Sequence, residues 1–497
     1  MTTAHATQGS PGSEDSAGAV LRNPRFLALW VAQVVTQVGG NMVLFGLTVE
    51  VFALTGASTS VSLLILSFLV PAVIFGAIAG VYVDRLDRRR ILIVTNAARG
   101  VLFLVLLAFP TDLGVIYLLT IAISTLSTFF GPAEIAMIPV VVPRRQLLAA
   151  NSLHIVTLQA SFFLGFALLG PLVINIAGQQ ILLILVAASY FIGAALCWML
   201  PAYKPRIGGV DAGEALGEAS NAVAATFHQL ADGLRFIRDH RAVFWPLTYL
   251  ALTASLIGVL GVLGPGFATQ ALGLSERDFV VIVLPLGVGL LMGILVLNAY
   301  GRLFTRRRAI EGGMFGLGIA LLALALAQPL STRLSLSISL LSIVIVVAFA
   351  AGVAYAFVAV PAQTQLQEEL PAQIRGRVFG VLNMLVSIAS FLPIIIVGPI
   401  ADNVGTSAVV MGSAIVVLVV AVISLWKAPP TDEGRIAGGL VDAMDPVTLS
   451  GRSLTQPIAL HFVDSHDETI PHVDLVSPVV PGVPGPAPAN PFDEPPE

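Results

Sequence analysis

Long runs of apolar residues dominate the chain, and short clusters of charged residues separate them. Twelve runs are long enough to cross a hydrocarbon core of about 30 Å as helices, which rise about 1.5 Å per residue. None alternates over about ten residues as a transmembrane β-strand does. We therefore expect an all-α polytopic membrane protein with spans at 26–54, 59–83, 90–109, 113–140, 147–177, 180–202, 242–268, 279–302, 306–327, 334–362, 372–400 and 406–428.

The composition supports a membrane protein. Of its 497 residues, 56% are hydrophobic and 11% are charged, whereas about 25% of the residues of a soluble domain are charged. Cys197 is the single cysteine, so an intrachain disulfide is impossible. Residues 1–21 lack the basic start of a cleavable signal peptide, and we expect the first apolar run to insert the chain. Nothing in the composition indicates nucleic-acid binding.

The basic residues predict how the chain is oriented in the membrane. If both termini are cytoplasmic, 22 of the 25 lysines and arginines fall in cytoplasmic segments, while Arg277 and Arg333 fall outside and Arg99 falls within a span. Cytoplasmic loops of polytopic proteins carry such a basic excess. We therefore expect a multi-pass protein of the cell membrane with both termini in the cytoplasm. Four tryptophans lie near the cytoplasmic helix ends, as an interfacial belt does: Trp30, Trp198, Trp245 and Trp426.

The two halves of the chain repeat each other. Chance could supply one similar pair of landmarks, but four pairs in the same order indicate two six-helix bundles in parallel orientation, related by a pseudo-twofold axis. The pairs are Arg22-Asn-Pro-Arg25 with Arg238-Asp-His-Arg241, Arg88–Arg90 with Arg306–Arg308, Pro132-Ala133 with Pro361-Ala362, and Gly170-Pro171 with Gly398-Pro399.

These patterns divide the chain into five segments. We expect a disordered N-terminal tail at 1–21, a first bundle at 22–202, a cytoplasmic linker at 203–241, a second bundle at 242–428 and a C-terminal tail at 429–497. The C-terminal tail is rich in proline and has eleven acidic residues against two basic ones, which is typical of a disordered segment. Its histidines and aspartates match no rigid metal-ligand spacing, so we expect no metal site.

Apolar residues recur at helical spacing in the second part of the linker. The pattern favours an amphipathic helix on the inner membrane surface, and a partner-binding helix is the alternative. The residues are Phe227, Leu230, Ala231, Leu234 and Ile237.

A charged loop follows the second apolar run. It reads Gly80-Val-Tyr-Val-Asp84-Arg85-Leu-Asp87-Arg88-Arg89-Arg90 and is similar to the signature loop of the major facilitator superfamily, with Leu86-Asp87 where the family has a glycine. Ala149-Ala-Asn-Ser-Leu153 and Arg375-Gly-Arg-Val378 resemble the branch that contains macrolide-efflux proteins and enterobactin-type siderophore exporters. The resemblance covers roughly residues 22–428. It implies a secondary transporter that works by alternating access.

The same resemblance assigns a gate to the signature loop. In the family the loop aspartate faces the N-terminus of span eleven, and the loop glycine lets the two helices approach; a carboxylate is favourable at a helix N-terminus. We expect a latch that keeps the cytoplasmic side closed, and a solvated turn is the alternative. The gating residues would be Gly80, Asp84, Arg85, Arg89, Arg375 and Arg377.

Three charged residues lie within or near the apolar spans. Arg99 in span three and Glu134 in span four have similar depths, and a charge in a membrane needs a partner. We therefore predict a contact between them, which is either a structural staple or part of a proton-exchange site. Glu50 lies near the outer end of span one. It could take up protons from outside, or it could be an interfacial glutamate.

Polar residues also lie on the spans that line the cavity in this family, namely spans one, four, seven and ten. Three residues of span one are spaced by four and therefore share one helix face. We expect a substrate cavity, and interhelical hydrogen bonding is the alternative. The residues are Gln33, Gln37, Asn41, Ser124, Thr128, Tyr355 and Gln363.

No catalytic constellation and no nucleotide-binding loop is present in the sequence, so we expect neither an enzyme nor a cofactor. The resemblance implies an exporter that is driven by inward proton flow, and the small number of charges in the spans favours an amphipathic or hydrophobic small molecule as its substrate. We expect the protein to act as a monomer. A lysophospholipid flippase of the same fold is one alternative. A non-transporting membrane scaffold that recruits partners through the acidic tail is another.

Overall fold

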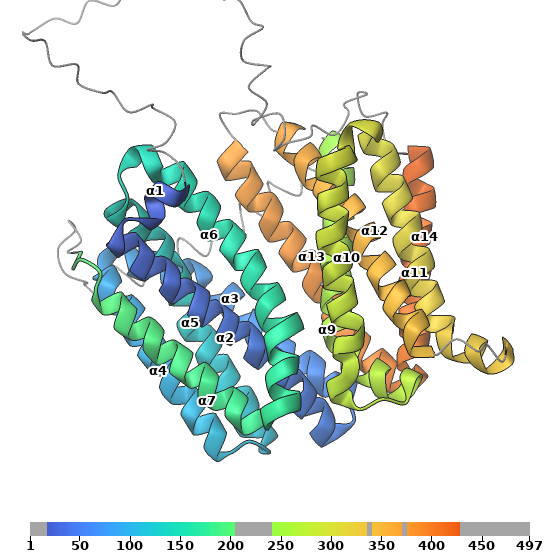
Figure 1. Cartoon of the computed structure of the whole chain (residues 1–497), viewed down its shortest axis with the longest axis horizontal. Coiled ribbons are helices and arrows are strands. Elements are labelled where there is room, and N and C mark those ends of the chain that lie inside the picture. The colour runs from blue at the N-terminus through green and yellow to red at the C-terminus, as the bar shows by residue number, and fades with distance from the viewer. Residues whose placement is uncertain (1–16, 204–240, 335–339, 370–374, 428–497) are drawn as a thin grey trace, which may run out of the picture. The chain divides into compact units, whose positions relative to one another are not determined.

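The computed structural model describes residues 17–203, 241–334, 340–369 and 375–427, and its regular elements within these ranges are helices (Figure 1). All of them belong to one compact unit. The long helices of the first half are α2 (Pro24–Thr55), α3 (Ser58–Arg85), α4 (Arg88–Ala108), α5 (Leu113–Val141), α6 (Leu147–Phe162) and α7 (Gly170–Trp198). Those of the second half are α9 (Arg241–Leu272), α10 (Val280–Tyr300), α11 (Arg306–Leu334), α12 (Leu340–Glu369), α13 (Arg375–Val404) and α14 (Thr406–Lys427).

Each predicted span coincides with a helical segment. Ten helical stretches in the described part are long and apolar enough to cross a membrane, and one of them, Arg144–Trp198, contains the fifth and sixth spans. Gly178 separates these two spans, because its backbone (φ 82°, ψ 173°) is not helical. Only Ala389–Val404 of the eleventh span qualifies as an apolar helix, and it is shorter.

Side chains next to the helices set where they begin and end. Asp87 accepts a hydrogen bond from the backbone N–H of Arg89 and caps α4, and Asp112 caps α5 in the same way through Val115. Such caps satisfy N–H groups that have no partner within the helix. Gly56 and Gly405 end α2 and α13 with positive φ, which glycine adopts without strain.

The folded part begins earlier than predicted. Residues Ala17–Leu21, which the sequence analysis assigned to a disordered tail, form the short helix α1. Val20 is fully buried in a cluster that also contains Phe26 and Leu29. Burial of an apolar side chain against α2 therefore orders a segment whose local composition gives no strong signal.

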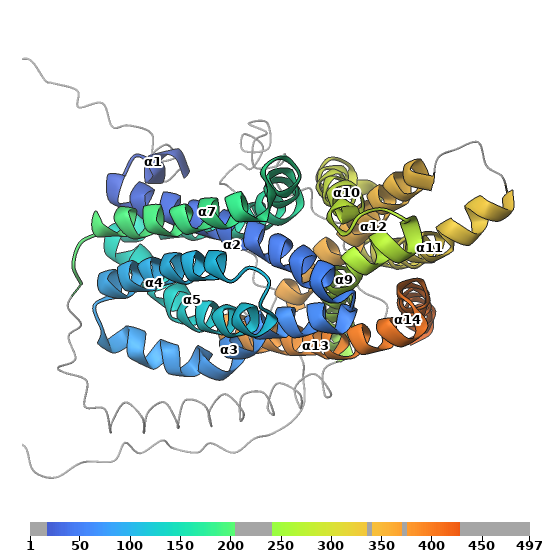
Figure 2. The same ribbon diagram turned by 90° about the horizontal axis from the view of Figure 1, so that it is seen from below.

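Helix neighbours repeat between the halves. In the first half α5 packs on α3 and α4, and α7 packs on α4. In the second half α12 packs on α10 and α11, and α14 packs on α11. Figure 2 shows α4 between α5 and α7, and α12 beside α10. The same order of contacts in each half confirms the predicted internal repeat.

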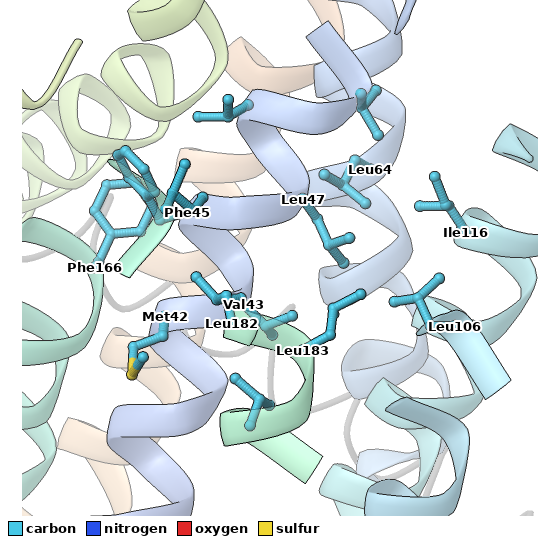
Figure 3. Close-up of a cluster of buried hydrophobic side chains, with 14 of the residues drawn as sticks. Met42, Val43, Phe45, Leu47, Leu64, Leu106, Ile116, Phe166, Leu182 and Leu183 are labelled. Carbon is cyan, nitrogen blue, oxygen red and sulfur yellow. The ribbon is translucent and has the colours of Figure 1, made fainter. Parts of the chain in front are cut away.

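The largest apolar core draws on both halves. Phe45, Leu64, Ile116 and Leu182 come from four helices of the first half, and Phe279 precedes α10 in the second. All five side chains are fully buried, and Figure 3 shows the part of this cluster around Phe45. Many large apolar side chains remain exposed elsewhere on the helices. In water such a surface would favour association, whereas in lipid it is matched by its surroundings.

Candidate functional site

Arginines at the start of α4 and α11 hold equivalent helix ends. Arg89 donates a hydrogen bond from Nη2 to the carbonyl oxygen of Trp198, at the end of α7. Arg307 donates from Nη2 to the carbonyl oxygen of Leu425 near the end of α14, at 3.0 Å. A cation at a helix C-terminus is favourable for the helix dipole. The repeat therefore extends from the sequence to the role of single side chains.

The preceding arginine of each half binds another helix. Arg88 donates to the carbonyl oxygen of Ala136 in α5 at 2.8 Å. Arg306 binds the carboxylate of Glu368 in α12 through both terminal nitrogens, at 2.7 and 3.1 Å. In both halves these arginines thus link helices of the same bundle.

The signature loop also holds the beginning of the linker. The Asp87 carboxylate accepts hydrogen bonds from the backbone N–H groups of Arg89, at 3.0 Å, and Tyr203, at 3.3 Å. The Arg88 guanidinium lies 4.4 Å from the centroid of the Tyr203 ring. Asp87 stands where the family has a glycine, and the sequence analysis assigned it no role. An Asp directly before a helix is an N-cap signal that could have drawn attention to it.

The predicted cytoplasmic latch is only partly described. Asp84 is 3.8 Å from Arg88 Nη2, and its side chain is 72% exposed. Arg85 is the half-buried last residue of α3. Among the described residues, no atom lies within 4 Å of a Cβ built on Gly80. The side chains of Arg375 and Arg377 lie outside the described part, so the latch remains a prediction.

Arg99 is the centre of a buried polar cluster between α4, α5 and α7. It donates to Asn96 Oδ1 at 2.5 Å, to Ser127 Oγ at 3.2 Å and to the carbonyl oxygen of Thr95 at 3.3 Å. Its guanidinium lies between two aromatic rings, 4.5 Å from the centroid of Phe130 and 4.7 Å from that of Tyr190. Cation–π contacts of this kind are stronger where water is excluded.

The predicted direct contact between Arg99 and Glu134 is not formed. Both side chains are almost fully buried, and they interact electrostatically, but the described part contains no ion pair within 4 Å between them. Glu134 Oε1 is buried and has no hydrogen-bond partner. Arg99 instead donates hydrogen bonds to Asn96, Ser127 and the carbonyl oxygen of Thr95, and the rings of Phe130 and Tyr190 lie against its guanidinium. The prediction matched the depth of the two charges but overlooked the nearer partners Asn96 and Tyr190.

The predicted cavity residues fall into two groups. Gln33 and Ser124 are buried and bind other helices, through the carbonyl oxygens of His154 at 3.2 Å and Phe68 at 2.5 Å. These contacts favour the alternative of interhelical hydrogen bonding for these two residues. The other five are half-buried: Gln37, Asn41, Thr128, Tyr355 and Gln363.

Two glycines let the fifth span approach α2. Gly165 lies within a π-helical segment, Phe163–Leu169, and Gly170 follows it directly. A Cβ built on Gly165 would lie 2.5 Å from the carbonyl oxygen of Val38, and one on Gly170 would lie 3.1 Å from Phe45 Cβ. These glycines therefore serve close helix packing.

An aromatic contact joins the halves near the end where α2 stops and α3 begins, which we call the Ser58 end. The rings of Phe45 in α2 and Phe279, directly before α10, stack with centroids 4.7 Å apart and an interplanar angle of 16°. Phe166 meets Phe45 edge-on at 5.6 Å, and Figure 3 shows these two side chains facing each other. Glu50, also in α2, is half-buried and interacts electrostatically with Arg277. The two halves are thus packed together at this end.

Two repeated helical bundles with apolar outer surfaces and mutual contacts at one end are typical of secondary membrane transporters. The family model of the Major Facilitator Superfamily matches residues 29–394. The chain belongs to this family, and the resemblance seen in the signature loop is confirmed. Within the described ranges no group of three or more His, Cys, Asp or Glu residues is arranged to hold a metal ion.

Several relatives are efflux proteins. The chain is 24% identical over 421 residues to the multidrug efflux pump Tap of Mycolicibacterium fortuitum, covering 82% of this chain and 96% of the pump. It is 22% identical over 407 residues to macrolide efflux protein A of Streptococcus pyogenes, covering 80% and 95%. The match to the transporter YfiS of Bacillus subtilis strain 168 is 26% identical over 184 residues and spans 44% of YfiS.

Solved transporter structures share the fold. The nucleoside transporter NupG superposes with a TM-score of 0.61 at 13% identity, covering 82% of this chain and 100% of NupG. The POT family transporter PepTSo superposes with a TM-score of 0.56 at 13% identity, covering 82% and 99%. At these identities the likeness establishes the fold and not the substrate.

Proposed function

We propose that this protein exports an amphipathic or hydrophobic small molecule in exchange for protons by alternating access. The observation that carries the proposal is the stacking of Phe45 on Phe279, since a carrier must close one end by contacts between its bundles. In this proposal the Ser58 end faces the outer side of the cell membrane and both termini lie in the cytoplasm, which the excess of basic residues in the loops at the opposite end supports. In this proposal the structure is closed toward the outside. Efflux activity of Tap and macrolide efflux protein A supports the direction.

Glu134 is the proposed proton carrier. It is 2% exposed, and its Oε1 has no partner. A buried carboxylate without a direct cationic partner is costly, whereas the neutral acid is tolerated. Arg99 is near enough to interact electrostatically with Glu134 but is bound to other groups, so it can stabilise the charged form for part of the cycle. Glu50, at the outer end of α2, is the proposed entry point for protons.

The proposed substrate class follows from the half-buried polar residues. Gln37 and Asn41 in α2 and Tyr355 and Gln363 in α12 offer hydrogen bonds without formal charge. Such a lining suits a molecule with an apolar body and a few polar groups. It lacks the arginines that would select phosphorylated or multiply anionic substrates. We propose that one chain is sufficient for transport.

Flux measured in proteoliposomes tests the proposal. A macrolide, a cationic dye and a lysophospholipid are assayed one at a time, with and without an imposed pH gradient. The proposal expects gradient-dependent accumulation of the macrolide or the dye. Accumulation of the lysophospholipid alone would support a flippase instead. If no compound accumulates under the pH gradient and none moves down its own concentration gradient, the proposed substrate class is contradicted.

A further inference from the structure

Helix α3 is capped by a residue from the other half of the protein. Asp402, in the last turn of α13, accepts hydrogen bonds from the backbone N–H of Ser58 at 2.7 Å and of Thr59 at 2.9 Å. It also accepts one from the Thr59 hydroxyl at 2.5 Å. The N-cap position of α3 is Ala57, which has no side-chain group that could form such a bond. The first turn of α3 therefore depends on α13 for its cap.

The backbones of the two helices are in contact one turn away. A Cβ built on Gly398 would lie 2.7 Å from the carbonyl oxygen of Ser58 and 2.4 Å from Ser62 Oγ. Ser62 is 2% exposed, and its hydroxyl has no hydrogen-bond partner. Gly398 and Asp402 are four residues apart and face α3 together. The glycine allows the approach that places the carboxylate over the helix N-terminus.

Other capped helices of the described part are capped within their own half. Asp112 caps α5 through Val115 N–H at 3.0 Å. Gln270 of α9 accepts hydrogen bonds from the backbone and side chain of Thr406, at the start of α14. Among the helix caps of the described residues, only the one that Asp402 forms would break if the two halves separated at the Ser58 end. A charged cap is also stronger than the neutral amide cap of Gln270.

We propose that Asp402 is a gating residue that holds the Ser58 end closed, because it can cap α3 only while α13 packs against that helix. The proposal rests on the proposed alternating-access function, in which this end faces outward. Opening would leave the first N–H groups of α3 to water and the carboxylate without its three donors. The clasp formed by Asp402, Ser58 and Thr59 thus favours one state of the cycle over the other.

The surroundings of Asp402 predict when the clasp is charged. Partial burial alone would raise the pKa of its carboxyl, but hydrogen bonds from the Thr59 hydroxyl, Thr59 N–H and Ser58 N–H together lower the pKa below its ordinary value. The packed elements present neutral groups: hydroxyls on α3, Gln270 on α9, and Tyr117 of α5, which donates to the Ser60 carbonyl oxygen at 3.1 Å. With its pKa lowered in the closed state, Asp402 stabilises that state at neutral pH and loses the effect only as the pH falls through the lowered value.

Distances across the closed end test the clasp. Spin labels are placed on cysteines that replace the exposed residues Leu54 and Met411, in a Cys197→Ser background in lipid nanodiscs. Asp402→Asn is expected to raise the ratio of long to short distances about two- to fivefold at neutral pH, the range expected for loss of a charge at a helix N-terminus. Asp112→Asn is the matched control, because it weakens an N-cap within one half and should leave the distances unchanged.

Two outcomes would overturn the proposal. One is an Asp402→Asn distribution identical to that of the wild type, and the other is an equal shift in Asp112→Asn. If Asp402→Asn fails to fold, Thr59→Val removes one of the three hydrogen bonds and should give a smaller shift in the same direction. The measurement needs neither substrate nor gradient. If flux is normal but Asp402→Asn does not change the distances, only the clasp is rejected. If Asp402→Asn changes the distances but no flux is measured, only the proposed substrate class is rejected.

Discussion

Phe45 and Phe279 stack face to face although about half the length of the folded chain separates them in sequence. Phe166 packs edge-on against both rings, at 5.6 Å and 6.2 Å between centroids. A contact between the halves at one end is expected to form and break in a carrier, whereas the contacts within each bundle persist. The stack is therefore a candidate gate, and single substitutions can test it.

Phe279→Leu should open the Ser58 end. The substitution keeps an apolar side chain but removes the stacking, which contributes about 0.5–1.5 kcal/mol beyond burial, so the ratio of closed to open molecules should fall about two- to tenfold. Labelling of a cysteine introduced near Phe45 by a membrane-impermeant reagent measures the opening. Phe304→Leu is the control, because Phe304 pairs with Phe357 inside the second half. Equal labelling in both variants would show that the stack does not gate this end.

Glu134→Gln should uncouple transport from the pH gradient. The amide preserves the shape of the buried side chain but cannot carry a proton, so gradient-driven accumulation should be lost while exchange of substrate down its own gradient continues. Flux in proteoliposomes with and without a pH gradient separates the two activities. Glu368→Gln is the control, since that carboxylate is 54% exposed and paired with Arg306. If Glu134→Gln keeps gradient-driven flux, Glu134 does not carry the coupled proton.

Arg99→Ala should destabilise the first bundle. It removes the hydrogen bonds that Arg99 donates to Asn96 Oδ1 and Ser127 Oγ and opens a void beside Phe130 and Tyr190, so the free energy of unfolding should fall by about 3 kcal/mol. Thermal unfolding of the detergent-purified protein gives the change in Tm. Arg90→Ala provides the comparison, because the Arg90 side chain is 85% exposed and its stability effect should be within about 0.5 kcal/mol. Similar Tm values for the two variants would contradict a structural role for the buried cluster.

Asp84→Asn tests the predicted latch at the signature loop. Asp84 is exposed and pairs with Arg88 at 3.8 Å, so its contribution to the stability of this state should be below about 1 kcal/mol. A latch to the start of α13 in the other state would nevertheless make the substitution change the balance between inward- and outward-facing states. Accessibility of a cysteine introduced at Leu303, in the loop after α10, reports that balance. Wild-type accessibility together with wild-type flux would favour the solvated turn.

The spans and the repeat were predictable because they rest on local patterns. Apolar runs between charged loops place most helices to within a few residues, although α12 covers 340–369 and not the predicted 334–362. The arginine clusters at Arg88 and Arg306 mark equivalent loops. The break at Gly178 also falls between the predicted fifth and sixth spans. These features depend on the hydrophobicity of each segment and on the conformational freedom of glycine, and both can be read from the local sequence without knowing the rest of the fold.

The partners of buried polar groups were not predictable in the same way. Arg99 and Glu134 have similar depths in the membrane, which suggested Glu134 as the partner of Arg99. The partner that Arg99 actually contacts depends on how α4, α5 and α7 are rotated relative to one another. The cap on α3 was also missed, because Asp402 and Ser58 are distant in sequence and only the packing at Gly398 brings them together. Ala57 was the available signal, since a helix that starts without a capping residue must find a partner elsewhere.

The most direct measurement follows both ends of the molecule in one set of variants. One spin-label pair at Leu54 and Met411 reports the Ser58 end, and another at Leu86 and Leu303 reports the opposite end; all four side chains are exposed. Alternating access predicts that variants which lengthen the first distance, such as Phe279→Leu, shorten the second. Lengthening of the first distance with no change in the second, or lengthening of both, would contradict a carrier that opens one end at a time.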